Sequence, residues 1–139
     1  MKMVLDTDVV VAAFRSTTGA SAALLRLARH GEITIAISVA LMLEYEAVLT
    51  REEHLVAASQ TVEDAHDLLN VLSDFAIKVD IDYIWRPQTR DPADEMVLET
   101  AINGQADAIV TFNRRDFGDA PSRFGVGCWL PSEALEKVR

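Results

Sequence analysis

Short apolar runs rich in β-branched residues recur along the chain, and longer amphipathic segments separate them. The runs fall at residues 3–5, 33–37, 77–79, 108–112 and 126–130, and each predicts a β-strand. Strands that alternate with helices favour one parallel sheet with helices on both faces. We therefore expect an α/β fold that binds its ligand outside the carboxyl ends of the strands.

Capping and breaking residues mark where the helices between these strands begin and end. Ser38 is a suitable N-cap for a helix that runs to about residue 50. Thr61 and Asp64 resemble a capping box, and Asp91 followed by Pro92 predicts the start of a helix that ends near residue 103. Further helices are expected at residues 20–29 and 52–59 and after residue 131, with a connecting loop over residues 80–90.

Length and composition suit one domain that spans residues 1–139, because half of the residues are apolar and a quarter are charged. The chain has 13 basic and 22 acidic residues, which gives a net charge of −9. Such a chain is a poor candidate for holding nucleic acid by a basic surface alone. If the protein acts on phosphates, another group must supply positive charge.

The single cysteine, Cys128, cannot form an internal disulfide, so a cytoplasmic location is expected. No stretch reaches the roughly 18 apolar residues that a membrane helix needs. The N-terminal apolar run is broken by Asp6 and Asp8 and does not have the form of a signal peptide.

Acidic residues follow two of the predicted strands. Asp6 and Asp8 come directly after the first strand, and Asn113 and Asp116 follow the strand at 108–112. Because the carboxyl ends of parallel strands share one edge of the sheet, we expect these groups to approach one another. Taken singly, Asp116 could equally be an ordinary turn residue.

Two further acids come from helices. Glu44 and Asp94 each lie at helical spacing within the apolar stripe of a helix, where an ionised carboxylate is costly unless it is paired or binds a metal. Asp94 could instead complement the helix dipole, Glu44 could pair with an arginine, and Asp91 could be an N-cap alone.

Together these acids predict a cation site. Like charges ~4 Å apart repel by about 4 kcal/mol at an effective dielectric near 20, so such a cluster needs a counter-cation. Oxygen ligands suit Mg²⁺ or Mn²⁺ rather than zinc. Zinc would require His or Cys at ligand spacing, and His30, His54, His66 and Cys128 do not have it; the histidines are expected at the surface.

In these segments the chain resembles the PIN-domain ribonucleases, of the kind that act as VapC-like toxins in type II toxin–antitoxin pairs. The matching segments are residues 4–8, 38–45, 90–95, 109–117 and 131–135, in the order found in the family. The resemblance implies a three-layer α/β/α fold around a parallel sheet. It also implies a metal-dependent nuclease that uses one or two Mg²⁺ or Mn²⁺ ions.

Carried over by position, the resemblance implies catalytic and metal-binding roles for particular residues. Asp6, Glu44 and Asp94 match the three core acids, and the fourth position falls at Asn113 or Asp116. Asp8 and Asp91 are weaker candidates as metal ligands. Substrate contacts are expected from Thr7, Thr111, Arg114 and Arg115, and Arg15, Arg86 and Arg90 are further candidates for binding the RNA backbone.

The reaction implied by the resemblance is hydrolysis of a phosphodiester bond of single-stranded RNA by a metal-activated water, without a covalent enzyme intermediate. The expected products carry 5′-phosphate and 3′-hydroxyl ends. The expected partners are the RNA substrate, a cognate antitoxin protein and a second copy of the chain.

Two other hypotheses remain open at this stage. Asp6-Thr7-Asp8 after an apolar strand also fits a haloacid-dehalogenase-like phosphatase, in which Asp6 would be the nucleophile, although no lysine follows a suitable helix start. Alternatively, the chain is a catalytically weak PIN-fold binding module, which the neutral Asn113 and the negative charge would suit. The retention of Asp6, Glu44 and Asp94 favours the nuclease.

Overall fold

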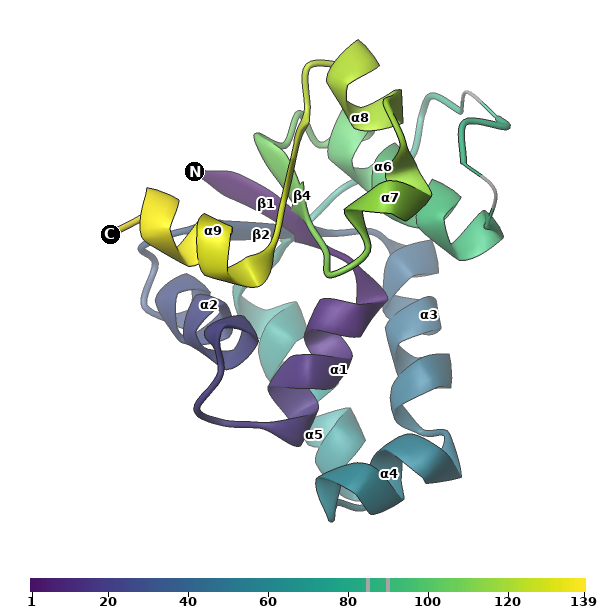
Figure 1. Cartoon of the computed structure of the whole chain (residues 1–139). Coiled ribbons are helices and arrows are strands. Elements are labelled where there is room, and N and C mark those ends of the chain that lie inside the picture. The colour runs from purple at the N-terminus through teal and green to yellow at the C-terminus, as the bar shows by residue number, and fades with distance from the viewer. Residues whose placement is uncertain (85, 90) are drawn as a thin grey trace.

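A computed structural model describes residues 1–84, 86–89 and 91–139 of the chain. Within these residues, five strands form one sheet in the order β3-β2-β1-β4-β5, and every pair of neighbours is parallel (Figure 1). The strands are β1 (Lys2–Leu5), β2 (Thr34–Ile37), β3 (Ile77–Lys78), β4 (Ala108–Val110) and β5 (Gly127–Trp129). The predicted α/β class with a central parallel sheet is confirmed.

The chain builds the sheet outward from β1 in two directions. From β1 it adds β2 and β3 on one side, and it then returns to add β4 and β5 on the other. Met3 of β1 pairs with Ile35 of β2 and with Ala108 of β4. This reversal of strand order leaves a crevice outside the carboxyl ends of β1 and β4, where open α/β sheets bind their ligands.

Helices cover both faces of the sheet (Figure 1). Helices α6 and α8 lie on one side, and α1, α2 and α5 lie on the other, with α3 in contact with α1, α5 and α6. The helices are α1 (Thr7–Arg15), α2 (Ala20–Arg29), α3 (Val39–Leu49), α4 (Glu52–Ala58), α5 (Val62–Phe75), α6 (Pro92–Asn103), α7 (Arg114–Phe117), α8 (Ala120–Arg123) and α9 (Pro131–Lys137). Among the described residues, no helix is both long and apolar enough to span a membrane.

The predicted helix caps are confirmed. The Ser38 hydroxyl accepts the N–H of Leu41 at the start of α3. Thr61 and Asp64 form a reciprocal capping box at the start of α5. Asp91 accepts the N–H of Ala93 at the start of α6. Each helix therefore begins where its local sequence signal indicates.

Helix α1 is not among the helices predicted from the pattern. Val9, Val10 and Val11 are β-branched and disfavour a helix by intrinsic propensity. The helix forms because the Asp6 side chain caps it and because all three valines are buried in the core. Tertiary burial thus outweighs local preference here. Strand β4 also ends two residues earlier than predicted, which leaves Thr111 and Phe112 in the loop beyond it.

Two glutamates of helix α6 form hydrogen bonds with the loop that precedes the helix. Carboxylate oxygen Oε1 of Glu95 accepts the N–H groups of Gln88 and Thr89, at 2.6 and 2.9 Å. Glu99 forms a two-bond ion pair with Arg86, with both N···O distances 2.7 Å. Residues 80–84 and 86–89 contain neither helix nor strand, as predicted for this loop, and Trp85 lies outside the described residues.

Candidate functional site

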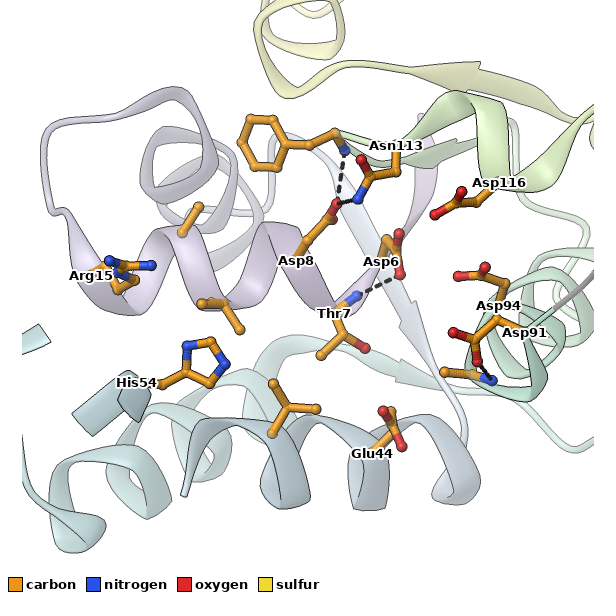
Figure 2. Close-up of a pocket in the computed structure, with 15 residues that line it drawn as sticks. Asp6, Thr7, Asp8, Arg15, Glu44, His54, Asp91, Asp94, Asn113 and Asp116 are labelled. Atoms are coloured by element: carbon orange, nitrogen blue, oxygen red, sulfur yellow. Dashed lines mark hydrogen bonds between the residues drawn. The ribbon is translucent and has the colours of Figure 1, made fainter. Parts of the chain in front are cut away.

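A pocket of about 460 Å³ lies at the carboxyl ends of β1 and β4 (Figure 2). It is lined by segments far apart in sequence: the residue after β1, helices α1, α3, α4, α6 and α7, and the loop after β4 all meet there. Nine of the residues that the sequence predicts for a site line this pocket: Asp6, Thr7, Asp8, Arg15, Glu44, Asp91, Asp94, Asn113 and Asp116. The fold therefore gathers acids from five segments of the chain into one space.

Asp6 is the most firmly positioned of these acids. It directly follows β1, and its N–H donates to the carbonyl of Val110 at 2.9 Å. Its carboxylate accepts the N–H of Thr7 at 2.8 Å and the hydroxyl of Thr111 at 2.7 Å. Only 8% of Asp6 is exposed. Burial raises the pKa of this carboxyl, and the two hydrogen bonds oppose that rise only in part.

Asp8 lies two positions after Asp6, in the first turn of α1, and faces the loop after β4. Its Oδ2 accepts the N–H of Phe112 at 3.1 Å and the side-chain amide of Asn113 at 3.2 Å. Its Oδ1 is buried and has no hydrogen-bond partner among the described residues. Burial, followed by the charge of Asp6, raises the pKa of Asp8 to about 7. Oδ2 of Asp8 thus binds the loop after β4, whereas Oδ1 is buried without a hydrogen-bond donor among the described residues.

Helices α6 and α7 bring three further acids to the same side of the pocket. Asp94 is 8% exposed, and its pKa is raised to about 7 by burial and then by the charges of Asp6, Asp91 and Asp116. Asp91 also caps α6, so its carboxylate serves the helix while it faces the pocket. The repulsion among these groups shows that the acids act on one another as a cluster.

Glu44 comes from α3, where it is half-buried beside the fully buried Tyr45. Figure 2 shows Glu44 on the helix below Asp91 and Asp94, and it shows Arg15 and His54 at the opposite end of the pocket. The pocket is therefore polarised, with acids gathered at one end and two basic side chains at the other.

The acidic end suits a hard divalent cation by its chemistry. Its donors are carboxylate oxygens with one amide, which match the ligands of Mg²⁺ and Mn²⁺. Buried carboxylates with raised pKa values, together with the unpartnered Oδ1 of Asp8, would be stabilised by such a charge. Across the described residues, no three His, Cys, Asp or Glu side chains already enclose a metal position. The fit thus rests on charge and donor chemistry rather than on a preformed cage.

The remaining predicted substrate residues lie elsewhere. Thr111 is fully buried behind Asp6 and donates to it, so it supports the acid rather than facing the pocket. Arg114 pairs with Glu133 at 3.0 Å. Arg115 lines a neighbouring pocket, which it shares with Asp94 and Asp116. Arg86 is committed to Glu99, and Arg90 lies outside the described residues.

The pocket also contains residues that the sequence does not single out. His54, expected at the surface, is half-buried in the wall of the pocket, and Phe112 forms part of the wall as well. The position of His54 follows from the packing of α4 against α1, for which the sequence carries no local signal. The sequence does not single out Phe112, because the apolar run at 108–112 predicts it inside the strand, whereas β4 ends at Val110.

The comparison with protein families agrees with this geometry. A family model described as "PIN domain" matches residues 2–115, which is most of the chain. None of the curated proteins that were compared with the chain matches it. PIN domains are generally metal-dependent nucleases, so the match does not favour the phosphatase hypothesis for Asp6. The chain belongs to the PIN domain family.

Proposed function

We propose that this protein is a Mg²⁺- or Mn²⁺-dependent endoribonuclease that cleaves single-stranded RNA as the toxin of a toxin–antitoxin pair. The observation that carries the proposal is the convergence of Asp6, Asp94 and Asp116 on one pocket at the crevice between β1 and β4. Membership of the PIN family supports nuclease chemistry. The order of the motifs, which resembles that of VapC-like toxins, supports RNA as the substrate.

The chain's own residues prepare this pocket for a phosphodiester. Asp6, Glu44, Asp94 and Asp116 are the residues that would hold the ion, with Asn113, Asp8 and Asp91 beside them. When bound, a divalent ion polarises a phosphoryl oxygen, lowers the pKa of water and neutralises developing charge. Thr111 and the N–H of Thr7 hold the carboxylate of Asp6 in one orientation. These two hydrogen bonds fix the side-chain conformation of Asp6, so that its carboxylate is already oriented for the ion.

The basic end of the pocket suits the phosphates that flank the scissile bond. Arg15 lies in the last turn of α1, and among the described residues it makes neither an ion pair nor a side-chain hydrogen bond. His54 faces the same space from α4. A strand of RNA that crosses the pocket would therefore place one phosphate among the acids and the next beside a cation.

An RNA cleavage assay tests the proposed function. Wild type and Asp6→Asn would be compared on a single-stranded RNA with Mn²⁺ and with chelator, and Asp67→Asn on the exposed face of α5 serves as the control. We expect cleavage by wild type and Asp67→Asn that requires Mn²⁺, and a loss of at least a hundredfold, on the order of 3 kcal/mol, with Asp6→Asn. Equal cleavage by wild type and Asp6→Asn would overturn the site.

We further propose that the protein acts in the cytoplasm, pairs with a second copy and is inhibited by a basic antitoxin. The net charge of −9 suits a basic partner. Val39 and Leu43 are exposed on α3 and provide apolar surface for such contacts. Sedimentation at several concentrations tests the pairing, and a mass that stays that of one chain at all of them would count against it.

A further inference from the structure

Phe112 is a large apolar side chain held at the rim of a polar pocket. It is 49% exposed, although it directly follows the fully buried Thr111. Its N–H donates to Asp8 at 3.1 Å, so the backbone that carries the ring is tied to the acidic end of the pocket. The proposed ion and hydrolysis do not use this ring. An exposed aromatic ring fixed beside a site is a candidate for contact with a ligand.

A second hollow, of about 330 Å³, lies beside the pocket. Its wall is formed mainly by Ala12, Gly19, Ala20, Leu130 and Pro131, which come from α1, the start of α2 and the start of α9. Ala12 and Phe112 line both spaces, so the apolar hollow and the acidic pocket are neighbours that share one wall. Its volume lies at the small end of the range for ligand pockets, roughly 300–1,000 Å³.

We propose that this hollow takes an unpaired base of the RNA strand and that Phe112 stacks on it. The inference rests on the proposed nuclease function and adds a specificity-determining residue to it. A strand with one phosphate among the acids must leave the pocket on one side, and Phe112 lies between the acidic pocket and the apolar hollow. Stacking on an aromatic ring tolerates every base because each has a π-face.

The charges around the hollow favour a base over a phosphate in it. Its wall has no charged side chain among the described residues, whereas Arg15 lies in the neighbouring pocket on the same helix as Ala12. The base can therefore enter the apolar space while its phosphate stays near the guanidinium.

This arrangement selects single strands. A base in a duplex is stacked and paired on both sides, and it would have to be unstacked to reach Phe112, which costs a few kcal/mol per step. The base site thus gives the enzyme a means of recognising unpaired RNA without reading its sequence.

A fluorescent base tests the proposal without relying on cleavage. A short RNA that carries 2-aminopurine next to the scissile position would be titrated into wild type, Phe112→Ala and Phe112→Trp in the presence of Ca²⁺. Tyr83→Ala, which removes another exposed aromatic ring, is the matched control. We expect quenching with wild type, Phe112→Trp and Tyr83→Ala. With Phe112→Ala we expect little quenching and binding that is about 5- to 150-fold weaker, and circular dichroism checks its fold.

The possible results separate this inference from the nuclease proposal. If wild type cleaves RNA and Phe112→Ala binds and quenches as well as wild type does, the base site is wrong and the nuclease stands. If quenching depends on Phe112 but no RNA is cleaved with Mn²⁺, the base site stands and the nuclease proposal fails. Absence of binding by wild type, or equal cleavage of single-stranded and duplex RNA, would also overturn the base site.

Discussion

Replacing Asp94 with asparagine is expected to stabilise the metal-free protein, because the pocket favours the neutral form of this side chain. Burial and the neighbouring acids raise the pKa of Asp94 from 3.8 to about 7. A shift of roughly three units would correspond to about 4 kcal/mol if all of it opposed folding. The pocket is open to water, which screens these charges, so we reduce the figure to about 1–2 kcal/mol.

A second effect acts in the opposite direction. Asp94 lies in the first turn of α6, where an ionised carboxylate stabilises the helix by about 0.3–1 kcal/mol, and asparagine loses this contribution. The net gain for Asp94→Asn at pH 8 is then about 1 kcal/mol, which corresponds to a rise in Tm of about 3 °C for a domain of this size. Asp94→Asn is stabilising only if the cost of burying the charged carboxylate is larger than its favourable interaction with the dipole of α6.

The gain should also depend on pH. The folded-state pKa of Asp94 lies above its unfolded value, so the folded protein binds the proton more tightly. Wild type therefore loses stability as the pH rises from about 4 to about 7, and the difference from Asp94→Asn should shrink at pH 5. The pKa of Asp8 is raised in the same direction, which adds to this trend in the metal-free protein.

Thermal unfolding in chelator at pH 8 and pH 5 measures these effects. The exposed Asp67 on α5 provides the control variant Asp67→Asn. Adding Mn²⁺ should raise the Tm of wild type and of the control, and it should raise that of Asp94→Asn much less. A folded Asp94→Asn protein that is less stable than wild type at pH 8 in chelator would refute the reasoning.

Substitutions at three other positions test the supporting contacts. Thr111→Val removes the hydroxyl that donates to Asp6, and we expect Mn²⁺ affinity to fall about 10- to 100-fold in a calorimetric titration; unchanged affinity would contradict that role. Glu99→Gln weakens the pair with Arg86 and should lower the free energy of unfolding in urea by about 2 kcal/mol. Asp91→Asn and Asp91→Ala both remove the charge of Asp91, but only asparagine keeps the α6 cap, so Asp91→Ala should be less stable than Asp91→Asn by about 1 kcal/mol in the same melt.

Local signals account for much of what the sequence predicts about the fold. A cap is a contact over three residues, so Ser38 and Asp91 can be recognised without knowing the rest of the structure. The strands are recognisable because they are buried and rich in β-branched residues. Asp6 was a candidate because it follows β1, and a residue there must face the ligand edge of a parallel sheet.

What could not be predicted depends on packing between distant segments. Helix α1 forms against the local preference of three valines because the core accepts them. His54 reaches the pocket through the packing of α4 against α1. Arg86 and Arg114 look like free cations in the sequence, but their partners Glu99 and Glu133 lie 13 and 19 positions away. Spacing along one helix does not reveal such pairs.

The central position of β1 has a consequence for protein synthesis. The first strand made by the ribosome finds its neighbour β2 early, but it must wait for β4, which pairs with it through Met3 and Ala108. Asp6 therefore meets Thr111 only after most of the chain has emerged. A nascent or prematurely terminated chain that lacks β4 carries the first acids without the support that orients them. The acidic pocket is therefore assembled late, after Asn113 and Asp116 have been added to the chain.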